Sequence, residues 1–412
     1  MKSKLLTLLL MASPASLLAS TMTLKESFQS ARLNMESIKR AKAVVNQSDE
    51  QKTRARAAVL PTISAVGSYT RIDPPNTGSS SPFLLTRQYA AGFRLTQPIL
   101  RGGTVSAYKL AEENRLLARY QEEATELNLY QLVIASYYNL AVAQADVKNV
   151  QQLLAFSRDR LKEIHERVKI GRSRKGEEAE AEAQLHIAES QYRQTLINLK
   201  QSEKNFEFYT RAIPSEITVE GVPKVQGSME EYMMKVRTRP DIMASQQQAR
   251  VASRQIDIAK GGHYPQVDLT SNYYLTRTGI LASSKWDVGV AVSVPLFQGG
   301  GVQAQVREAV EGHRIAELNS SETLRAAERD IAITYQNFLE IQEQLKTLKE
   351  ALLRSEEAYK LNRKDYQYGL VTNLEVLQSL NVFIETKRSY DSLVAMANLN
   401  YKSLEAATGV LP

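Results

Sequence analysis

The sequence contains no cysteine in 412 residues. Without a thiol the chain cannot form a disulfide, a thiolate metal site or a catalytic cysteine. Its 4 histidines make no HExxH pair, and neither GxxxxGK nor GxGxxG occurs, so the motifs of zinc proteases and phosphate-binding loops are also missing. Because no catalytic constellation is visible, we expect no enzyme activity, no cofactor and no metal.

The chain also has little excess of charge of one sign. It carries 52 basic and 45 acidic residues, for a formal net charge of +7. The two signs are mixed along helical stretches, and no basic block adjoins an aromatic cluster. Solvated helix faces explain such a pattern. We therefore expect no nucleic-acid partner.

Apolar runs of about 18 residues, long enough to cross a bilayer as a helix, are missing as well. The apolar run at residues 5–11 is too short to span, but it follows Lys2 and Lys4 and precedes small residues up to Ser20. This is the order of regions in a secretory signal. We expect residues 1–20 to be a signal peptide and the remaining chain to be exported without a transmembrane helix.

Two similar corners organise the rest of the chain. In residues 95–103 and again in 292–300, an alternating run meets a proline and a glycine pair follows. Proline is tolerated at the end of a strand but not inside a central one, and glycine permits a sharp turn. Each corner therefore predicts that a strand ends there and that a helix begins after the turn. The corner residues are Pro98, Gly102 and Gly103 in the first copy and Pro295, Gly299 and Gly300 in the second.

Four runs that alternate apolar and polar residues predict strands in two pairs. Period two gives each strand one apolar and one polar face. The predicted strands are residues 60–71 and 87–98 in the first pair and 264–276 and 285–295 in the second. Aromatic residues lie toward their loop ends, where an interfacial girdle would sit in a membrane protein. These aromatic residues are Tyr69, Tyr89, Tyr273 and Trp286.

A long heptad pattern follows each corner. Apolar residues recur every seven positions from Val133 to Val168 and from Ile331 to Tyr366. Such seams predict two long helices that supercoil against neighbours. Turn glycines, Gly171 and Gly369, precede shorter returning helices. Further helices are predicted before each strand pair, over residues 22–58 and 239–260.

The two seams share one register, since each residue of the second lies 198 positions after its counterpart in the first. A fixed offset over several elements predicts an internal duplication. We expect residues 21–212 and 229–412 to be two repeats joined by a connector at 213–228. Each repeat would contain a helix, a strand pair, a long helix and a return helix.

These elements predict a mixed α and β membrane protein. A sheet that spans lipid must close, because every backbone group needs a partner. Four strands cannot enclose a lumen, so we expect copies of the chain to associate. Three copies would supply twelve strands and a pore, whereas two would supply eight and a nearly filled interior; we favour three. The helices would continue the barrel as a tube. The alternative is a secreted coiled-coil structural or adaptor protein without a pore.

The order and spacing of these segments resemble the TolC-type outer-membrane efflux family. The residues that carry the resemblance are Leu60-Pro61, Pro98 with Gly102-Gly103, Arg239-Pro240-Asp241, Tyr264-Pro265, Pro295 to Gly300 and residues 368–377. The resemblance implies a homotrimer with a twelve-stranded barrel in the Gram-negative outer membrane and an α-helical coiled-coil tunnel in the periplasm. It also implies an exit channel for drug efflux or type I protein secretion. A periplasmic adaptor and an inner-membrane pump would engage the closed helix tips.

The resemblance further implies residues that close the periplasmic entrance. Carboxylates six positions after each turn glycine, Glu177 and Glu375, would line it, and Tyr366 would make closing contacts. Alternatively, Glu375 is a helix N-terminal acid favoured by the dipole, and Tyr366 a plain seam residue. This chain has Val371 where a basic residue is expected and Gln378 where a second acid is expected. The resemblance therefore implies one acidic layer at the entrance. Any contact that latches the helix tips closed would use other residues.

The first turn is basic instead. Its cations are Lys169, Arg172, Arg174 and Lys175. They would meet Glu375 of a neighbouring copy or acidic groups of an adaptor, or they are solvated charges at a helix tip. The sequence leaves these alternatives open.

Overall fold

The computed structural model describes residues 21–73, 87–224, 227–279 and 281–412. The expected signal peptide lies outside the described residues, as does most of the loop between the first two strands. By its internal contacts the chain divides into two units. Of the described residues, the hairpin unit contains those within Met1–Met35, Asn128–Met229 and Ile331–Pro412, and the strand unit contains those within Glu36–Leu127 and Glu230–Asp330.

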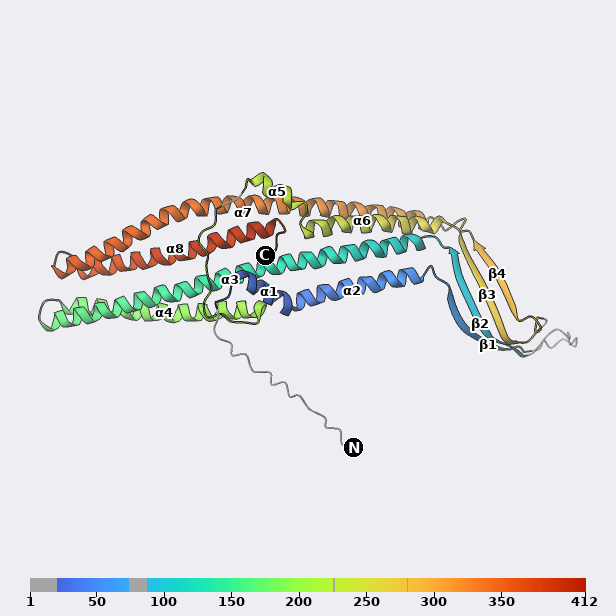
Figure 1. Ribbon diagram of the computed structural model, residues 1–412, viewed down its shortest axis with the longest axis horizontal. Coiled ribbons are helices and arrows are strands. Elements are labelled where there is room, and N and C mark those ends of the chain that lie inside the picture. Colours follow the sequence, from blue (N-terminus) through green and yellow to red (C-terminus); the bar gives the residue numbers. More distant parts are fainter. Residues whose placement is uncertain (1–20, 74–86, 225–226, 280) are drawn as a thin grey trace, which may run out of the picture. The chain divides into compact units, whose positions relative to one another are not determined.

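The strand unit contains one antiparallel sheet. Its strands are β1 (Thr62–Arg71), β2 (Arg87–Leu100), β3 (Gln266–Arg277) and β4 (Trp286–Ser293). They lie in the order β1-β2-β3-β4 (Figure 1). The central contact therefore pairs β2 with β3, which are far apart in the sequence. The four predicted strands are confirmed, with differences at the corners.

At the corners the strands do not end where the prolines predict. Strand β2 continues two residues beyond Pro98 to Leu100, and β4 ends at Ser293, two residues before Pro295. Pro98 is tolerated because its pairing with β3 is irregular there, with a register shift between Pro98 and Leu100. Such a shift interrupts the ladder, and prolines inside sheets concentrate at bulges.

The register places all four apolar faces on one side of the sheet. One row of paired residues joins Ala65, Phe93, Tyr273 and Trp286. The neighbouring row, on the opposite face, joins Ser64, Arg94, Asn272 and Asp287. Most large side chains of the apolar face are exposed in the single chain: Ile63, Tyr69, Tyr89, Phe93, Tyr273, Leu275, Trp286, Val288, Val290 and Val292. The chain by itself therefore leaves an apolar sheet face uncovered.

The first corner needs glycine for a close backbone approach. A Cβ on Gly102 would lie 1.9 Å from the carbonyl oxygen of Gly261, at the end of the helix before β3. Gly103 has φ +82°, a left-handed conformation that glycine adopts without steric cost. At the second corner, Gly299 and Gly300 have φ +61° and +81°. The predicted turns are confirmed, but the role of Gly261 was not foreseen.

Shorter helices precede each strand pair in the sequence. In place of one helix over residues 22–58, α1 (Leu24–Asn34) and α2 (Glu36–Ala57) are separated at Met35, whose backbone is extended. The helix α5 (Met229–Val236) was not predicted. The helix α6 (Pro240–Lys260) begins with Pro240 as expected, and the 3-10 turn η1 (Gly261–His263) follows it.

Two long helices and their return helices are confirmed. They are α3 (Thr104–Lys169), α4 (Lys175–Thr210), α7 (Gly301–Gln367) and α8 (Asn373–Ala407). α3 and α7 each contribute residues to both units. Seam residues such as Val133, Leu140, Ile331 and Phe338 are fully buried in the hairpin unit. Among the residues that the structure describes, no helix is both long and apolar enough to cross a membrane.

Candidate functional site

Two tight turns form the helix tips of the hairpin unit (Figure 1). The turn between α3 and α4 contains Gly171 with φ +71°, and the turn between α7 and α8 contains Gly369 with φ +77°. The left-handed backbone at a glycine ends a helix within one residue. As a result, Glu177 and Glu375 both lie in the first turn of the helix that follows.

Glu375 caps its own helix. Its carboxylate accepts hydrogen bonds from the backbone N–H of Thr372 at 2.6 Å and from the Thr372 hydroxyl at 2.8 Å, completing a capping box. The backbone hydrogen bond, followed by the hydroxyl, lowers the pKa of Glu375 below its ordinary value. The carboxylate therefore stays ionised at neutral pH and exposed at the start of α8. This is the helix N-terminal acid that the sequence offered as one alternative.

Glu177 and Tyr366 meet across the two hairpins. The Tyr366 hydroxyl donates to Glu177 Oε2 at 3.4 Å. Glu177 also accepts a hydrogen bond from Ser173 and lies 3.6 Å from Arg174 Nη2. Three of the residues singled out in the sequence are therefore brought together in one chain. Arg172 is exposed at the first turn.

Two arginines of α3 lie over the Tyr366 ring, and sequence reasoning missed both. Their Cζ atoms are 3.7 Å (Arg160) and 4.6 Å (Arg167) from the ring centre. These residues are seven apart and directly precede the seam residues Leu161 and Val168. A charge beside a heptad seam is the signal that could have found them, because that flank faces the next helix.

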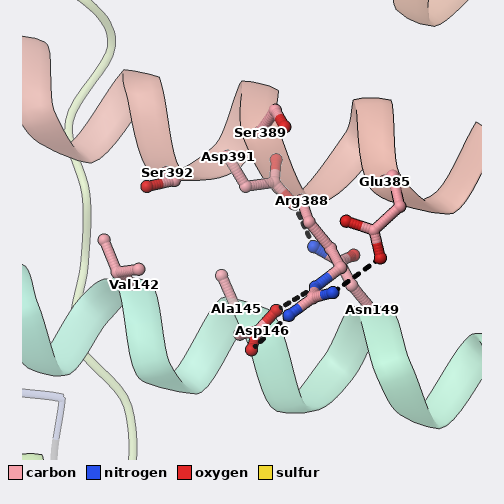
Figure 2. A pocket seen from close by; sticks show the side chains of 9 residues that line it. All are labelled: Val142, Ala145, Asp146, Asn149, Glu385, Arg388, Ser389, Asp391 and Ser392. Carbon is pink, nitrogen blue, oxygen red and sulfur yellow. Dashed lines mark hydrogen bonds and ion pairs between the residues drawn. The ribbon is translucent and has the colours of Figure 1, made fainter. Parts of the chain in front are cut away.

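Further along the hairpin unit, α3 and α8 are joined by polar contacts (Figure 2). The Arg388 guanidinium lies against the Asp146 carboxylate, with Nη2 3.1 Å from Oδ2, and Asn149 donates to Asp391 at 2.7 Å. Arg388 also contacts Glu385 at 2.7 Å. These side chains line an open cavity of about 320 Å³. Together with the tip contacts, they hold the two hairpins side by side.

An apolar cluster lies between these polar groups and the tips. It includes Tyr359 and Phe383, whose stacked rings have their centres 6.1 Å apart. The cluster comprises Leu153, Leu154, Ala188, Tyr359, Tyr366, Val376, Leu380, Phe383 and Ile384. Tyr366 is therefore a seam residue and also a partner in polar contacts. A place in the seam does not exclude a role in contacts between the hairpins.

The described part of the chain offers no group of three or more His, Asp or Glu side chains placed to hold a metal ion. The site consists instead of ion pairs, stacked rings and capping groups between helices. Such an arrangement can fix or release one hairpin against another.

Comparisons with known proteins agree with this geometry. The outer membrane efflux protein family model matches residues 28–210 and 236–409, which include all four strands. The outer membrane protein TolC of Escherichia coli is 22% identical, with 94% of this chain and 82% of that protein covered. The cation efflux system protein CusC of Escherichia coli is 21% identical, over 79% of this chain and 73% of that protein.

A solved structure shares the fold. The Campylobacter jejuni CmeC outer membrane channel superposes with a TM-score of 0.84 at 18% identity, covering 94% of this chain and 85% of that chain. The matches do not support the alternative of a coiled-coil protein without a pore. The chain belongs to the outer membrane efflux protein family, and it is therefore a passive outer membrane channel rather than an enzyme.

Proposed function

We propose that three copies of this chain form the exit channel of a tripartite efflux system, through which substrates of an inner-membrane pump leave the cell. The sheet of one chain has an open edge at β1 and another at β4. In lipid those edges must be paired. Three chains joined edge to edge give twelve strands, which enclose a lumen.

The uncovered apolar face of the sheet carries this proposal. The side chain of Trp286 and the valines of β4 are all exposed in the single chain. A contiguous apolar face of this kind marks contact with a membrane or a partner. Its aromatic residues at the loop end and the polar residues on the opposite face fit a lipid-facing surface around a water-filled lumen.

The helices extend the channel into the periplasm, and their tips close it. A periplasmic adaptor binds the helices and opens the tips, and the pump supplies the energy and most of the selection. The two repeats of the chain give each protomer two hairpins in the tunnel wall. The contact between Tyr366 and Glu177 supports closure at the tips, since it joins the two hairpins of one chain.

Glu375 forms a ring of carboxylates around the closed entrance. Each copy is ionised because Thr372 holds the charged form. Three like charges at a narrow opening attract cations, as acidic rings do in cation-selective pores. The basic first turn, with Arg172 and Arg174, faces acidic groups of the adaptor.

Planar-bilayer conductance of the purified protein tests this function. We compare the wild type with Glu375→Gln, which can still cap the helix, and with Glu350→Gln, a change at an exposed residue of α7. A small cation-selective conductance that loses its selectivity only in Glu375→Gln is expected. If selectivity is unchanged, Glu375 does not line the entrance. If folded wild-type protein produces no conductance, the chain does not form a pore.

A further inference from the structure

The apolar face of the sheet ends in a pair of arginines. Strands β1 and β2 pair in one unbroken register, in which Tyr69 lies opposite Tyr89 and, two positions further along, Arg71 lies opposite Arg87. Side chains alternate between the two faces of a sheet. Both arginines therefore share the face of the two tyrosines, and both are exposed. This is the face that the proposed function places in lipid.

These two cations have too few anions around them. Residues directly opposite each other in an antiparallel pair have their Cβ atoms about 4.5–5.5 Å apart, and like charges there are destabilising. In the described part of the chain, neither guanidinium has an ion pair or a hydrogen bond. Asp73 is the only acidic residue in residues 51–111, and the acids of β3 and β4, Asp268 and Asp287, lie on the opposite, polar face. The apolar face therefore supplies at most one carboxylate for this pair.

In the proposed channel, the pair lies at the depth of the lipid headgroups. Strand β1 has 10 residues, of which Arg71 is the last, and a tilted strand of this length crosses the hydrocarbon layer. Neighbours on one face of a strand are about 7 Å apart, so the arginines extend past the interfacial tyrosines. At that depth the cost of an arginine on a lipid face has fallen close to zero.

We propose that Arg71 and Arg87 bind the phosphate group of a net-anionic lipid in the outer leaflet of the membrane. The inference rests on the proposed function, since it requires the apolar face of the sheet to lie in lipid. A guanidinium can donate two parallel N–H groups to phosphate oxygens, and such charge-assisted hydrogen bonds are stronger than neutral ones. One phosphate between the two arginines receives donors from both and offsets the repulsion between them.

The surface beside the arginines favours a lipid over free phosphate. Ile63, Tyr69 and Tyr89 are exposed on the same face, further from the loop end. A lipid whose phosphate lies at the arginines places its acyl chains along these side chains, and burial of apolar surface contributes to binding. Free phosphate gains only the contacts with the arginines. The site therefore recognises a headgroup and an acyl chain together.

Quenching of a single tryptophan by brominated lipid tests the site. The chain has 1 tryptophan, Trp286, so Trp286→Phe with Tyr89→Trp moves the only reporter next to Arg87 on the same face. The full-length protein with these two changes is reconstituted in vesicles of phosphatidylcholine and phosphatidylglycerol, with bromine on the chains of one lipid at a time. Because bromine quenches on contact, the two titrations give the affinity for phosphatidylglycerol relative to phosphatidylcholine at this place.

We expect the reporter protein to prefer phosphatidylglycerol. Arg71→Gln and Arg87→Gln should each lower that preference roughly fivefold, the contribution of one cation near an anionic membrane surface. The preference should also weaken as the salt concentration rises. The matched control is Arg94→Gln, which removes the same kind of side chain from β2 on the polar face. This control should keep the preference of the reporter protein.

Each outcome supports or overturns the lipid site. A preference that survives in both Arg71→Gln and Arg87→Gln overturns it, and so does an equal fall in Arg94→Gln, because total charge would then attract the lipid. Inorganic phosphate added at constant ionic strength should leave the preference unchanged. If it abolishes the preference, the pair binds free phosphate and the lipid site is wrong.

Failure of the site is distinguishable from failure of the channel function. Equal quenching by the two lipids contradicts the phosphate site alone. Absence of quenching by either lipid contradicts the lipid-facing orientation of the sheet, and the proposed function with it. If Tyr89→Trp prevents assembly, Trp286 serves as the reporter in the otherwise unchanged chain, since it lies on the same face of the sheet. The same fall is then expected, and the same results overturn the site.

Discussion

Placing a charge on the apolar face of the sheet would test the orientation of the sheet directly. Val290 lies near the middle of β4 and is 59% exposed. It pairs with Leu269 of β3 on the same face. An arginine on the lipid face at mid-depth costs about 2–4 kcal/mol. In a trimer the cost of Val290→Arg is three times that, about 6–12 kcal/mol for the assembly.

The neighbouring residue provides a matched control. Ala291 points to the opposite face and pairs with Asp268, whose carboxylate lies 3.2 Å from Arg101. An arginine at this position would enter a polar environment with an acid nearby. Both substitutions add the same side chain to the same strand, although Val290→Arg also removes a residue that favours strands, a difference of at most about 1 kcal/mol. The larger difference is the environment of the face, so Ala291→Arg should assemble nearly as the wild type does.

Urea titration of purified protein folded into lipid vesicles measures the difference. We expect the unfolding midpoint to fall for Val290→Arg and to stay near the wild-type value for Ala291→Arg, with the yield of heat-resistant oligomer following the same order. Equal midpoints for the two variants, or a wild-type midpoint for Val290→Arg, would refute the assignment of this face to lipid.

Two further predictions concern the strand unit. Gly102→Ala should destabilise it by about 1–3 kcal/mol, because the new Cβ would meet Gly261 O at 1.9 Å; Gly301→Ala, with no atom within 4 Å, is the control in thermal unfolding. Burial opposes ionisation of Asp241, but the hydrogen bonds and charge of Arg239 outweigh it and lower its pKa. The stabilisation from this pair is therefore present when the pH is above the ordinary carboxyl pKa. It is lost as the pH falls through the pKa of Asp241 in the folded protein. Asp241→Asn should make the free energy of unfolding depend less steeply on pH in the acid range. An unchanged dependence on pH would contradict this.

Much of the secondary structure follows from periodicity. The seven-residue seams predicted α3 and α7 to within a few residues, because such a row of apolar side chains lies on one face of a helix and packs against a neighbouring helix. Alternation predicted the four strands for the same kind of reason. The break at Met35 and the helix α5 were missed, since neither leaves a comparable repeating pattern. The end of β2 was missed because a register shift, which pattern alone does not reveal, accommodates Pro98.

Some residues of the candidate site could also be found from the sequence, and others could not. Glu177, Glu375 and Tyr366 could be singled out from their spacing to the turn glycines and a family resemblance. The cap at Glu375 is local, so the sequence could offer it as an alternative. Arg160 and Asn373 could not be foreseen as partners, because they are 213 residues apart and meet only when α3 packs beside α8.

The sequence by itself determined where the long helices, their return helices and the four strands lie, which side of each strand is apolar, and which family it resembles. These properties depend on the order of residues along one element. The tertiary structure decided that β2 pairs with β3, that Gly102 needs Gly261, and that the cations around Tyr366 come from α3. Those contacts depend on side-chain direction and on the distance between elements, which are fixed only when the helices and strands pack together.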